Sequence, residues 1–492
     1  MTGGGAAPDV DRVVVVGASL AGWTAAQALR AEGFTGRLTL IGDEGHAPYD
    51  RPPLSKAVLS GWLPAHHTDL PEVAEVDAEW LLGTPAAGLD LAARDVRLAD
   101  GRRVGYDRLL IATGTRARPW PDPAGAALDG VFTLRTREDA AALRARLAAG
   151  PRRVLVVGAG FTGSEIASVT RDLGLPVTVV ERSTAPLAGP LGGAAGAVAA
   201  RVHRAHGVDL RCNTTVMALE GDDAGRLRAA RLSDGDVLEA DVAVVALGAV
   251  RNVEWLAGAG LAADARGVVC DGACRVFDAD AIVLDDVFVA GDVARWPHAL
   301  YDGELLAVEH WGNAVDQART AAHNMVCAPA DRRAHRGLPA FWSNQFGDNI
   351  KSVGVPPFAD QIALVQGSVE AGRFAAAYGR RGRTVAAVTV NMPRALAFYA
   401  GLVAAGAPFP PVLHPPDGPA EPTPIDAGFP PSGQATHSSG AVPTGPGPSA
   451  PPEAAPGPAV TVPDPRTPPG AAPLSWVPAE SGRSSARPGG AP

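Results

Sequence analysis

One pattern occurs twice in this chain of 492 residues, and it constrains the fold more than any other feature. Residues 12–44 read RVVVVGASLAGWTAAQALRAEGFTGRLTLIGDE, and residues 152–182 read RRVLVVGAGFTGSEIASVTRDLGLPVTVVER. Each stretch has a β-branched run, a glycine-rich turn, a helical apolar pattern and a second β-rich run that ends near an acid. This order predicts a βαβ unit whose turn and helix N-terminus bind a pyrophosphate. One such motif is weak evidence, but the repeat predicts two dinucleotide sites.

The first turn departs from the usual three-glycine pattern. Its candidate binding residues are Gly17, Ala18, Ser19, Ala21 and Gly22, with Ser19 in the middle glycine position. A small residue at that position still lets the backbone approach a pyrophosphate. We expect either Asp43 or Glu44, at the end of the second strand, to bind a pair of ribose hydroxyls.

The second turn carries the complete pattern, with Gly158, Gly160 and Gly163. Glu181 ends its second strand. A carboxylate there binds a ribose 2′,3′-diol and repels a 2′-phosphate, which favours NADH. The neighbouring Arg182 weakens this preference and leaves NADPH as the alternative.

Further strand ends are predicted to lie at these sites. The runs YDRLLIATG and ADVAVVALG end in the small-residue turns Ala112-Thr113-Gly114 and Ala246-Leu247-Gly248. We expect both turns to cross between the nucleotide domains, where the backbone passes close to a cofactor. Asp292, at the end of VFVAGD, is predicted to bind a ribityl or phosphate-linked hydroxyl, although Gly-Asp also forms plain turns.

The loop YDRPPLSK ends in an unusual residue for this chain. Of 43 basic residues, Lys56 and Lys351 are the two lysines, so arginine is the default cation here. Lys56 follows two prolines that stiffen its loop. We interpret Lys56 as a functional residue rather than one surface cation among many.

Composition excludes several classes of function. The formal charge is -9, which argues against nucleic-acid partners, and no apolar run is long enough to predict a membrane span. The four cysteines form no C-x-x-C pair and no zinc spacing, so we expect no metal site and a reduced, cytoplasmic protein. Residues 408–492 hold 25 of the 45 prolines, which predicts a disordered tail with stretches of polyproline II.

Beyond these motifs, the chain resembles a known family, the FAD-containing, NAD(P)H-dependent ferredoxin reductases, within the glutathione-reductase-like superfamily. The resemblance covers about residues 12–400 and rests on PYDRPPLSK, IATGT, LRTREDA, VVGAGFTGSEIA, NVEWL, VFVAGDVAR, VEHWGNAVDQAR, FWSNQFG and NMPRA. These reductases serve bacterial oxygenases and haem-thiolate monooxygenases. RPPLSK, EHW and FWSNQFG are narrow signals, whereas the glycine motifs alone point only to the superfamily.

The resemblance implies an α/β fold with two Rossmann-like dinucleotide domains, the first interrupted by the second. The expected organisation is an FAD domain at 10–120 and 255–335, an NAD domain at 121–254, a C-terminal α/β domain at 336–407 and the disordered tail. FAD would contact the first turn, Asp43, Arg51, Lys56, Arg135 and Asp292, with Glu309, His310 and Trp311 at its isoalloxazine ring. NADH would contact Gly158, Gly160, Gly163, Glu181 and Gly248.

The resemblance also gives Lys56 a role, because it would pair with Glu165 beside the flavin N5 edge. A single ammonium can donate to N5 and shift when the reduced flavin gains charge, whereas the arginine fork cannot substitute simply. Glu165 would thereby avoid being an uncompensated charge, and its alternative interpretation is a first-turn acid on the helix dipole. One departure is Arg251, which stands where the family often has proline.

The resemblance implies hydride transfer from NADH to FAD and single-electron transfer to a 2Fe-2S ferredoxin. Because ferredoxins are usually acidic, residues 331–337 and 379–383 are candidate basic docking segments, with solvated loop arginines as the alternative. No cysteine lies near the first motifs, so thiol chemistry at the flavin is disfavoured.

Two other functions stay open. One is reduction of a rubredoxin, a quinone or a radical, since PYDRPPLSK is also similar to monodehydroascorbate reductases. The other is a flavin- and NADH-switched interaction protein, like the apoptosis-inducing factors. The sequence does not define the oligomeric state.

Overall fold

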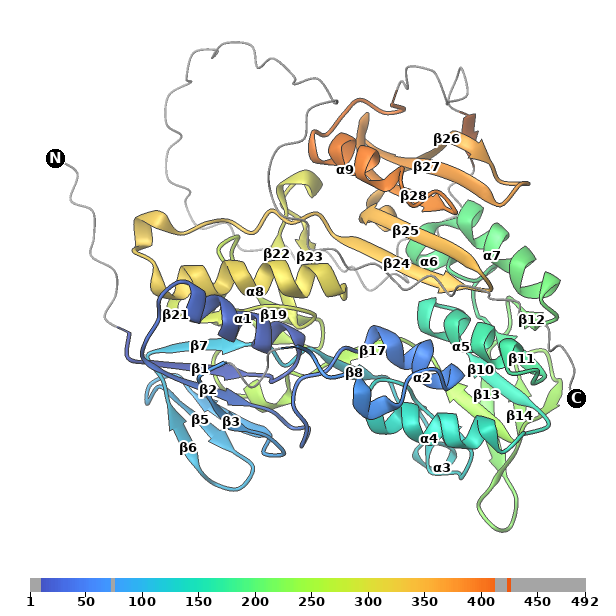
Figure 1. Cartoon of the computed structure of the whole chain (residues 1–492), viewed down its shortest axis with the longest axis horizontal. Helices are drawn as coiled ribbons and strands as arrows, with labels where there is room; N and C mark the ends of the chain where they lie inside the picture. The colour runs from blue at the N-terminus through green and yellow to red at the C-terminus, as the bar shows by residue number, and fades with distance from the viewer. Residues whose placement is uncertain (1–9, 72–75, 412–422, 426–492) are drawn as a thin grey trace, which may run out of the picture. The chain divides into compact units, whose positions relative to one another are not determined.

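The computed structural model describes residues 10–71, 76–411 and 423–425, and Figure 1 shows the arrangement of their helices and strands. The first glycine motif lies in a six-stranded sheet of order β20-β21-β7-β1-β2-β3. Its strands are β1 (Arg12–Val16), β2 (Arg37–Ile41), β3 (Glu79–Leu81), β7 (Arg108–Ile111), β20 (Arg275–Phe277) and β21 (Val283–Val289). Because β20 and β21 come after the second motif in sequence, the first dinucleotide fold is interrupted, as predicted.

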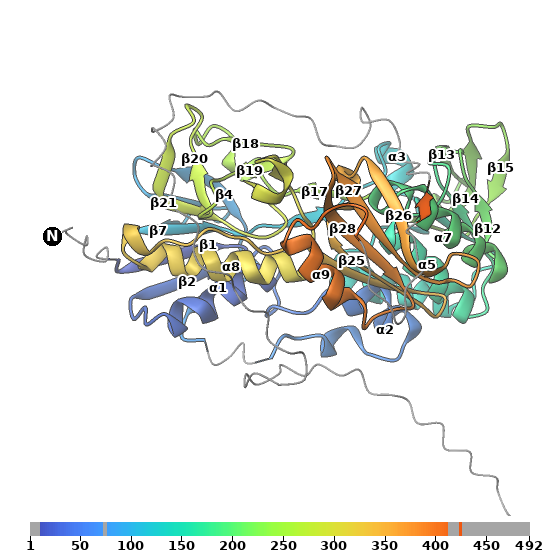
Figure 2. The same ribbon diagram turned by 90° about the horizontal axis from the view of Figure 1, so that it is seen from above.

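Two helices cover one face of this sheet. Helices α1 (Leu20–Ala31) and α8 (Trp311–Val326) lie side by side there, as Figures 1 and 2 both show. Their small residues, including Ala25, Ala318 and Ala322, are fully buried and let the two helices approach closely. The opposite face packs against a three-stranded sheet of β4 (Ala86–Asp90), β5 (Asp95–Leu98) and β6 (Arg103–Gly105).

The second glycine motif lies in a separate sheet of order β12-β11-β10-β16-β9. The five strands are β9 (Val131–Phe132), β10 (Val154–Val157), β11 (Val177–Val180), β12 (Asp209–Arg211) and β16 (Val242–Val245). All their pairings are parallel, and their valine-rich runs are buried on both faces. Helices α4 (Arg137–Ala148), α5 (Phe161–Asp172) and α7 (Gly193–Ala205) contribute to the same core.

Two short strands connect the nucleotide folds. Strand β8 (Thr115–Ala117) leaves the first sheet and β17 (Ala249–Arg251) returns to it, and the two pair antiparallel with Arg251 opposite Thr115. The smaller elements of the two nucleotide folds are α2 (Ala57–Ser60), α3 (Pro123–Ala126), α6 (Ala188–Leu191), β13 (Val216–Gly221), β14 (Leu227–Leu232), β15 (Val237–Glu239), β18 (Ala263–Asp264), β19 (Gly267–Val269), β22 (Ala294–Pro297) and β23 (Leu305–Leu306).

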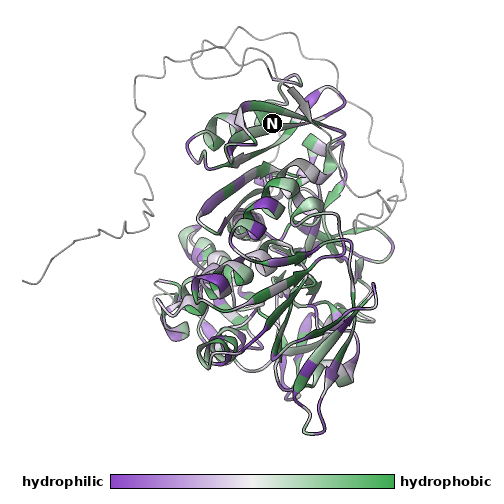
Figure 3. Cartoon of the chain, turned by 90° about the vertical axis from the view of Figure 1, so that its right-hand side faces the viewer, coloured by the Kyte–Doolittle hydropathy of each residue, from purple (hydrophilic) through white to green (hydrophobic). Residues whose placement is uncertain are grey.

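A C-terminal sheet follows, of order β24-β25-β28-β27-β26-β29, and all its pairings are antiparallel. It contains β24 (Ala340–Gln345), β25 (Asp348–Gly354), β26 (Gln361–Ser368), β27 (Arg373–Arg380), β28 (Arg383–Val390) and β29 (Thr423–Ile425). One face packs on α9 (Leu396–Ala404), and the other packs on α6 and α7 of the second nucleotide fold. Figure 3 shows the hydrophobic strands of these sheets between more polar surface segments.

The tail predicted to be disordered, residues 408–492, has two described segments. Residues 408–411 differ from that prediction, because Pro408 forms a β-bridge with Arg383 and accepts a hydrogen bond from Thr384 Oγ1. Thr423–Ile425 form β29 and differ from that prediction, because Ile425 pairs with Ile362 on the otherwise open edge of β26. Residues 412–422 and 426–492 of the predicted tail lie outside the described residues. Within the described ranges, no helix has both the length and the apolar character needed to cross a membrane.

Candidate functional site

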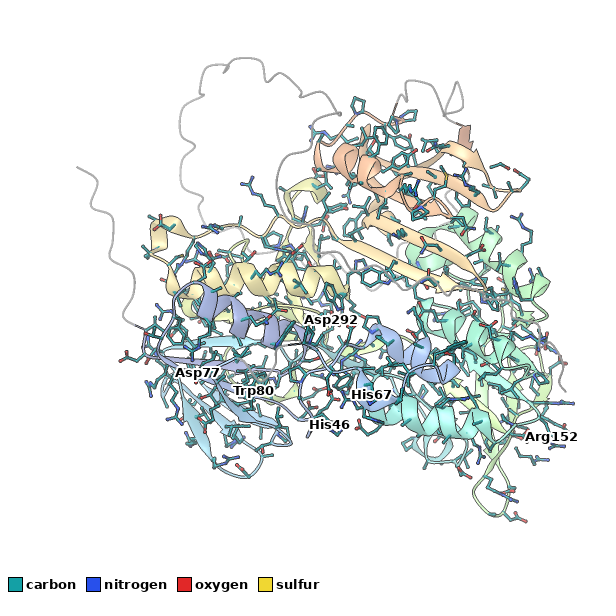
Figure 4. All side chains as sticks on the ribbon, viewed as in Figure 1. His46, His67, Asp77, Trp80, Arg152 and Asp292 are labelled. Carbon is teal, nitrogen blue, oxygen red and sulfur yellow. The ribbon has the colours of Figure 1, made fainter. Side chains whose placement is uncertain are left out.

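One cleft gathers side chains from all three sheet regions. Its lining includes Ser19, Ala21, Tyr49, Asp50, Arg51, Ser55, Lys56, Ala112, Thr113, Gly114, Arg135, Phe161, Thr162, Glu165, Gly291, Asp292, Glu309, His310, Trp311, Phe341 and Trp342. Most of the predicted flavin-contacting residues are among them. Asp292 is labelled in Figure 4 near one end of α8, the helix that begins at Trp311.

The first glycine turn has the geometry of a pyrophosphate cradle. Gly17 has φ +118°, and a Cβ there would lie 2.1 Å from the Ala112 carbonyl oxygen. A Cβ on Gly22 would lie 1.9 Å from the Gly17 carbonyl oxygen. Ser19 is the N-cap of α1, and its side chain makes no capping hydrogen bond. The turn therefore presents free N–H groups at a helix N-terminus, which fits the phosphates of FAD.

The glycines of the second turn repeat this geometry outside the cleft lining, whereas Phe161 and Thr162 of the same turn line the cleft. Gly158 has φ +100° and approaches the Ala246 carbonyl oxygen, and Gly163 approaches the Gly158 carbonyl oxygen. At Gly160 and Gly248 an added Cβ would meet no atom within 4 Å. The space beside these two glycines is open.

The acids at the strand ends have different surroundings. Glu44 forms an ion pair with Arg51 and accepts a hydrogen bond from the Tyr49 hydroxyl, whereas Asp43 is exposed and accepts from the Glu44 backbone N–H. Asp43 is therefore the freer of the two predicted ribose ligands. Glu181 accepts from the backbone N–H groups of Ala159 and Ser183, each at 2.7 Å, which fixes its carboxylate beside the second turn.

Lys56 and Glu165 meet, as the sequence predicts. The Lys56 Nζ lies 2.7 Å from the Glu165 Oε2, with side chains that are 27% and 7% exposed. Glu165 also accepts from Ser55 Oγ, and its other oxygen accepts from Ser343 Oγ at 2.6 Å. Donors from the proline loop and from β24 thus fix an acid that α5 of the second nucleotide fold supplies. Four hydrogen-bonded groups from three regions of the chain make this pair well ordered.

Arg51 and Arg135 lie on the wall of the cleft. Arg51 donates to the Arg135 carbonyl oxygen at 2.8 Å. Arg135 donates to Asp292 Oδ2 at 3.0 Å and to the Thr115 carbonyl oxygen at 3.0 Å. The predicted flavin contacts Arg135 and Asp292 are therefore paired with each other at the cleft.

The start of α8 and the segment before it place three predicted residues in the cleft. Burial raises the pKa of Glu309, while Arg251, 2.9 Å away, acts in the opposite direction. Burial also lowers the pKa of His310 to about 4, and its Nδ1 has no partner within the described chain. His310 is therefore neutral at pH 7. Trp311 donates to Asp50 Oδ1 at 3.0 Å and is 40% exposed at the edge of the cleft.

Three residues of the site were not singled out from the sequence, namely Ser55, Ser343 and Asp50. The pairing of Arg251 with Glu309 was also not predicted from the sequence. Ser55 lies in RPPLSK and Ser343 in FWSNQFG, so the narrow motifs contained both. Their contact with Glu165 joins residues more than 100 positions apart, which no local pattern encodes.

No thiol lies in the cleft. Cys270 and Cys274 are buried and unpaired, and burial raises the pKa of both thiols. Cys212 and Cys327 are also free. Dithiol chemistry at the cleft therefore has no residue to perform it. In the described ranges, no group of three or more His, Cys, Asp or Glu residues could hold a metal ion.

The candidate basic segments are partly neutralised. Arg380 and Arg381 both lie within ion-pair distance of Asp302, and Arg380 stacks on Phe358. Arg332 is paired with Asp285 at 2.6 Å. Exposed Arg333 and Arg336 contribute the remaining positive charge of the 331–337 segment.

Two glycine-turn nucleotide folds and an antiparallel C-terminal sheet, meeting at one cleft, define a two-nucleotide flavoprotein reductase. The chain belongs to the pyridine nucleotide-disulphide oxidoreductase family, whose model matches residues 11–318. A reductase C-terminal model matches residues 340–414. This family uses FAD and NAD(P)H, and the match confirms the resemblance and the fold class predicted from the sequence.

Several similar proteins are named as ferredoxin reductase components of dioxygenase systems. A probable ferredoxin reductase of Castellaniella defragrans is 39% identical over 80% of this chain and 92% of its own length. Rhodocoxin reductase of Rhodococcus erythropolis is 37% identical over 78% of this chain and 87% of its own. The structure of a covalent putidaredoxin reductase–putidaredoxin complex aligns with a TM-score of 0.74 at 31% identity, covering 81% of this chain and 94% of that one.

Proposed function

We propose that this protein oxidises NADH and, through bound FAD, passes single electrons to a 2Fe-2S ferredoxin of an oxygenase system. The observation that carries the proposal is the cleft where Lys56 and Glu165 meet between the two glycine turns. The relatives named as ferredoxin reductases of dioxygenase and putidaredoxin systems support the acceptor.

Residues of the first nucleotide fold would hold the FAD. The turn from Gly17 to Gly22 binds the pyrophosphate, Asp43 the adenosine ribose, and Arg51 with Asp292 the remaining polar groups. Lys56 would donate to the N5 edge, and Glu165, which accepts hydrogen bonds from Ser55 and Ser343, holds its ammonium in place. When bound, the flavin supplies hydride acceptance and single-electron donation, which no side chain of the chain provides.

The second fold would hold the nicotinamide nucleotide. The turn from Gly158 to Gly163 binds its pyrophosphate, with Gly248 beside it. The Glu181 carboxylate would lie near the 2′-position of the ribose, so we expect NADH to be preferred over NADPH. Phe161 and Thr162 begin α5 and line the cleft, so they limit the space for the nicotinamide ring.

The domain organisation follows from this assignment. We propose an FAD domain at 10–120 and 255–335, an NAD domain at 121–254 and a C-terminal domain from residue 336 that covers the cleft through Phe341 and Trp342. These two residues line the cleft from β24, and Trp342 is 38% exposed. An exposed aromatic residue beside a buried cofactor site suits docking of an acceptor protein.

An anaerobic experiment tests the function. The purified yellow protein is mixed with NADH or NADPH, and cytochrome c reduction is followed with and without a 2Fe-2S ferredoxin. We expect fast bleaching by NADH and cytochrome c reduction that depends on the ferredoxin. Fast bleaching without ferredoxin-dependent cytochrome c reduction would indicate that the electron acceptor is a quinone or a radical and not a ferredoxin. Slow bleaching with a long-lived reduced complex would instead support the flavin-switched interaction protein.

A further inference from the structure

Arg251 has an ion-pair partner outside its own sheet, in the segment between β23 and α8. It ends β17, the strand that returns from the second nucleotide fold, and its guanidinium lies 2.9 Å from Glu309 Oε1. The Arg251 side chain is 15% exposed, and its Nε has no partner within the described chain. Arg251 is therefore far less exposed than the arginine of the neighbouring Arg116–Glu254 ion pair, and its guanidinium pairs with a single carboxylate.

Glu309 lines the cleft that also holds Lys56 and His310. Its side chain is 36% exposed, so it is more open to the cleft than the Arg251 side chain. The charged groups that act on it are Arg251 from β17, Asp292 after β21, Arg135 before α4 and Arg118 after β8. Arg251 is the charge that most favours the ionised form of Glu309. Burial and Asp292 both act against that form, so the ion pair with Arg251 opposes them.

We propose that Arg251 is a positioning residue for the redox site, because its ion pair fixes the place and the charge of the Glu309 carboxylate beside the bound cofactors. A flavin gains negative charge when it is reduced. An unpaired carboxylate in the same cleft opposes that charge, and a paired one opposes it less. Arg251 thereby favours the reduced cofactor without touching it.

The inference rests on the flavin site of the proposed function, and it does not depend on the acceptor. A protein that binds flavin but reduces no ferredoxin still permits the test. Absence of bound flavin would overturn the proposed function itself, so the two failures are distinguishable.

The test is the flavin midpoint potential of the purified holoprotein, measured by dye equilibration from pH 5.5 to 8.5. We compare the wild type with Arg251→Gln, Glu309→Gln and the double variant. In Arg251→Gln the potential should fall at high pH, and the difference from wild type should shrink as pH falls and Glu309 binds a proton. The Glu309 inflection should move upward by about one pH unit. In the double variant the effect of Arg251→Gln should vanish.

Arg116→Gln is the matched control, since Arg116 lies on the paired strand β8 and forms an exposed ion pair with Glu254. It should leave the potential curve unchanged. Superimposable curves for wild type and Arg251→Gln would overturn the proposal, as would an equal shift in the Glu309→Gln background. If Arg251→Gln does not fold, Glu309→Gln decides: a raised potential with a flatter pH dependence supports the proposal, and an unchanged curve overturns it.

Discussion

The two glycine turns have almost the same backbone and different surroundings. In both, the first glycine has a positive φ, and a Cβ there would clash with a carbonyl oxygen, that of Ala112 in one and of Ala246 in the other. In the first turn the middle residue is Ser19, and the strand-end acid Glu44 is bound by Arg51. In the second the middle residue is Gly160, and Glu181 is fixed by backbone N–H groups. Close backbone packing is thus required in both turns. The strand-end acids differ in their partners, and this difference distinguishes the ligands that we expect the two turns to bind.

The largest expected effect comes from filling the two cradles. Gly17→Ala places a Cβ 2.1 Å from backbone, which no rotamer relieves, so we expect a loss of about 3 kcal/mol or more in the free energy of unfolding. The purified variant should lack yellow flavin. Gly158→Ala should retain flavin and lose bleaching by NADH. Absorbance at the flavin band measures the bound flavin. A Gly158→Ala protein without flavin would contradict the assignment of FAD to the first turn and NADH to the second.

A buried histidine in the second half predicts an acid-sensitive stability. His203 is fully buried, and burial lowers its pKa to about 4, so the folded state releases a proton that the unfolded chain binds below pH 6.5. The contribution of neutral His203 to the free energy of unfolding is fully present above pH 6.5. It is lost as the pH falls towards 4, by up to about 3 kcal/mol.

The measurement is the free energy of unfolding of wild type and His203→Leu against pH. We expect a shallower loss in the variant, whereas His335 near the first sheet, whose pKa is also lowered to about 4, keeps its own contribution. Identical slopes in the two proteins would show that His203 does not carry the effect.

Lys56→Met tests the ion pair with Glu165, which joins the proline loop to α5 of the second nucleotide fold. It leaves the Glu165 carboxylate buried with only hydroxyl donors, and we expect flavin reduction by NADH to slow by roughly 10- to 100-fold. Ser343→Ala should slow it less, because the lysine remains. Stopped-flow bleaching measures both. Lys351→Met on β25 is the matched control and should behave as wild type.

Replacing the strand-end acids sharpens the difference between the turns. Glu181→Ala should raise the KM for NADH about tenfold and leave the KM for NADPH closer to its original value, because the ribose diol loses its acceptor. Asp43→Ala should instead weaken FAD retention. Equal losses for NADH and NADPH in Glu181→Ala would remove the selectivity argument.

The smallest expected effect is at Ser19. Its side chain makes no capping hydrogen bond, so Ser19→Gly should change the affinity for FAD by no more than about twofold. Flavin release during dialysis measures this. A large change would mean that the serine hydroxyl contacts the cofactor and that the two turns differ in mechanism as well as in sequence.

The sequence alone determined the two nucleotide folds and their order, because each glycine turn is a local pattern of strand, turn and helix. It also determined Lys56, Glu165 and the segment from Glu309 to Trp311 as candidates, through motifs and the family resemblance. Only the tertiary structure decided which polar groups pair in the cleft. Ser343 reaches Glu165 from 178 positions away, and Arg251 reaches Glu309 across two folds. Such contacts depend on how separate sheets meet, and no periodicity along the chain records that arrangement.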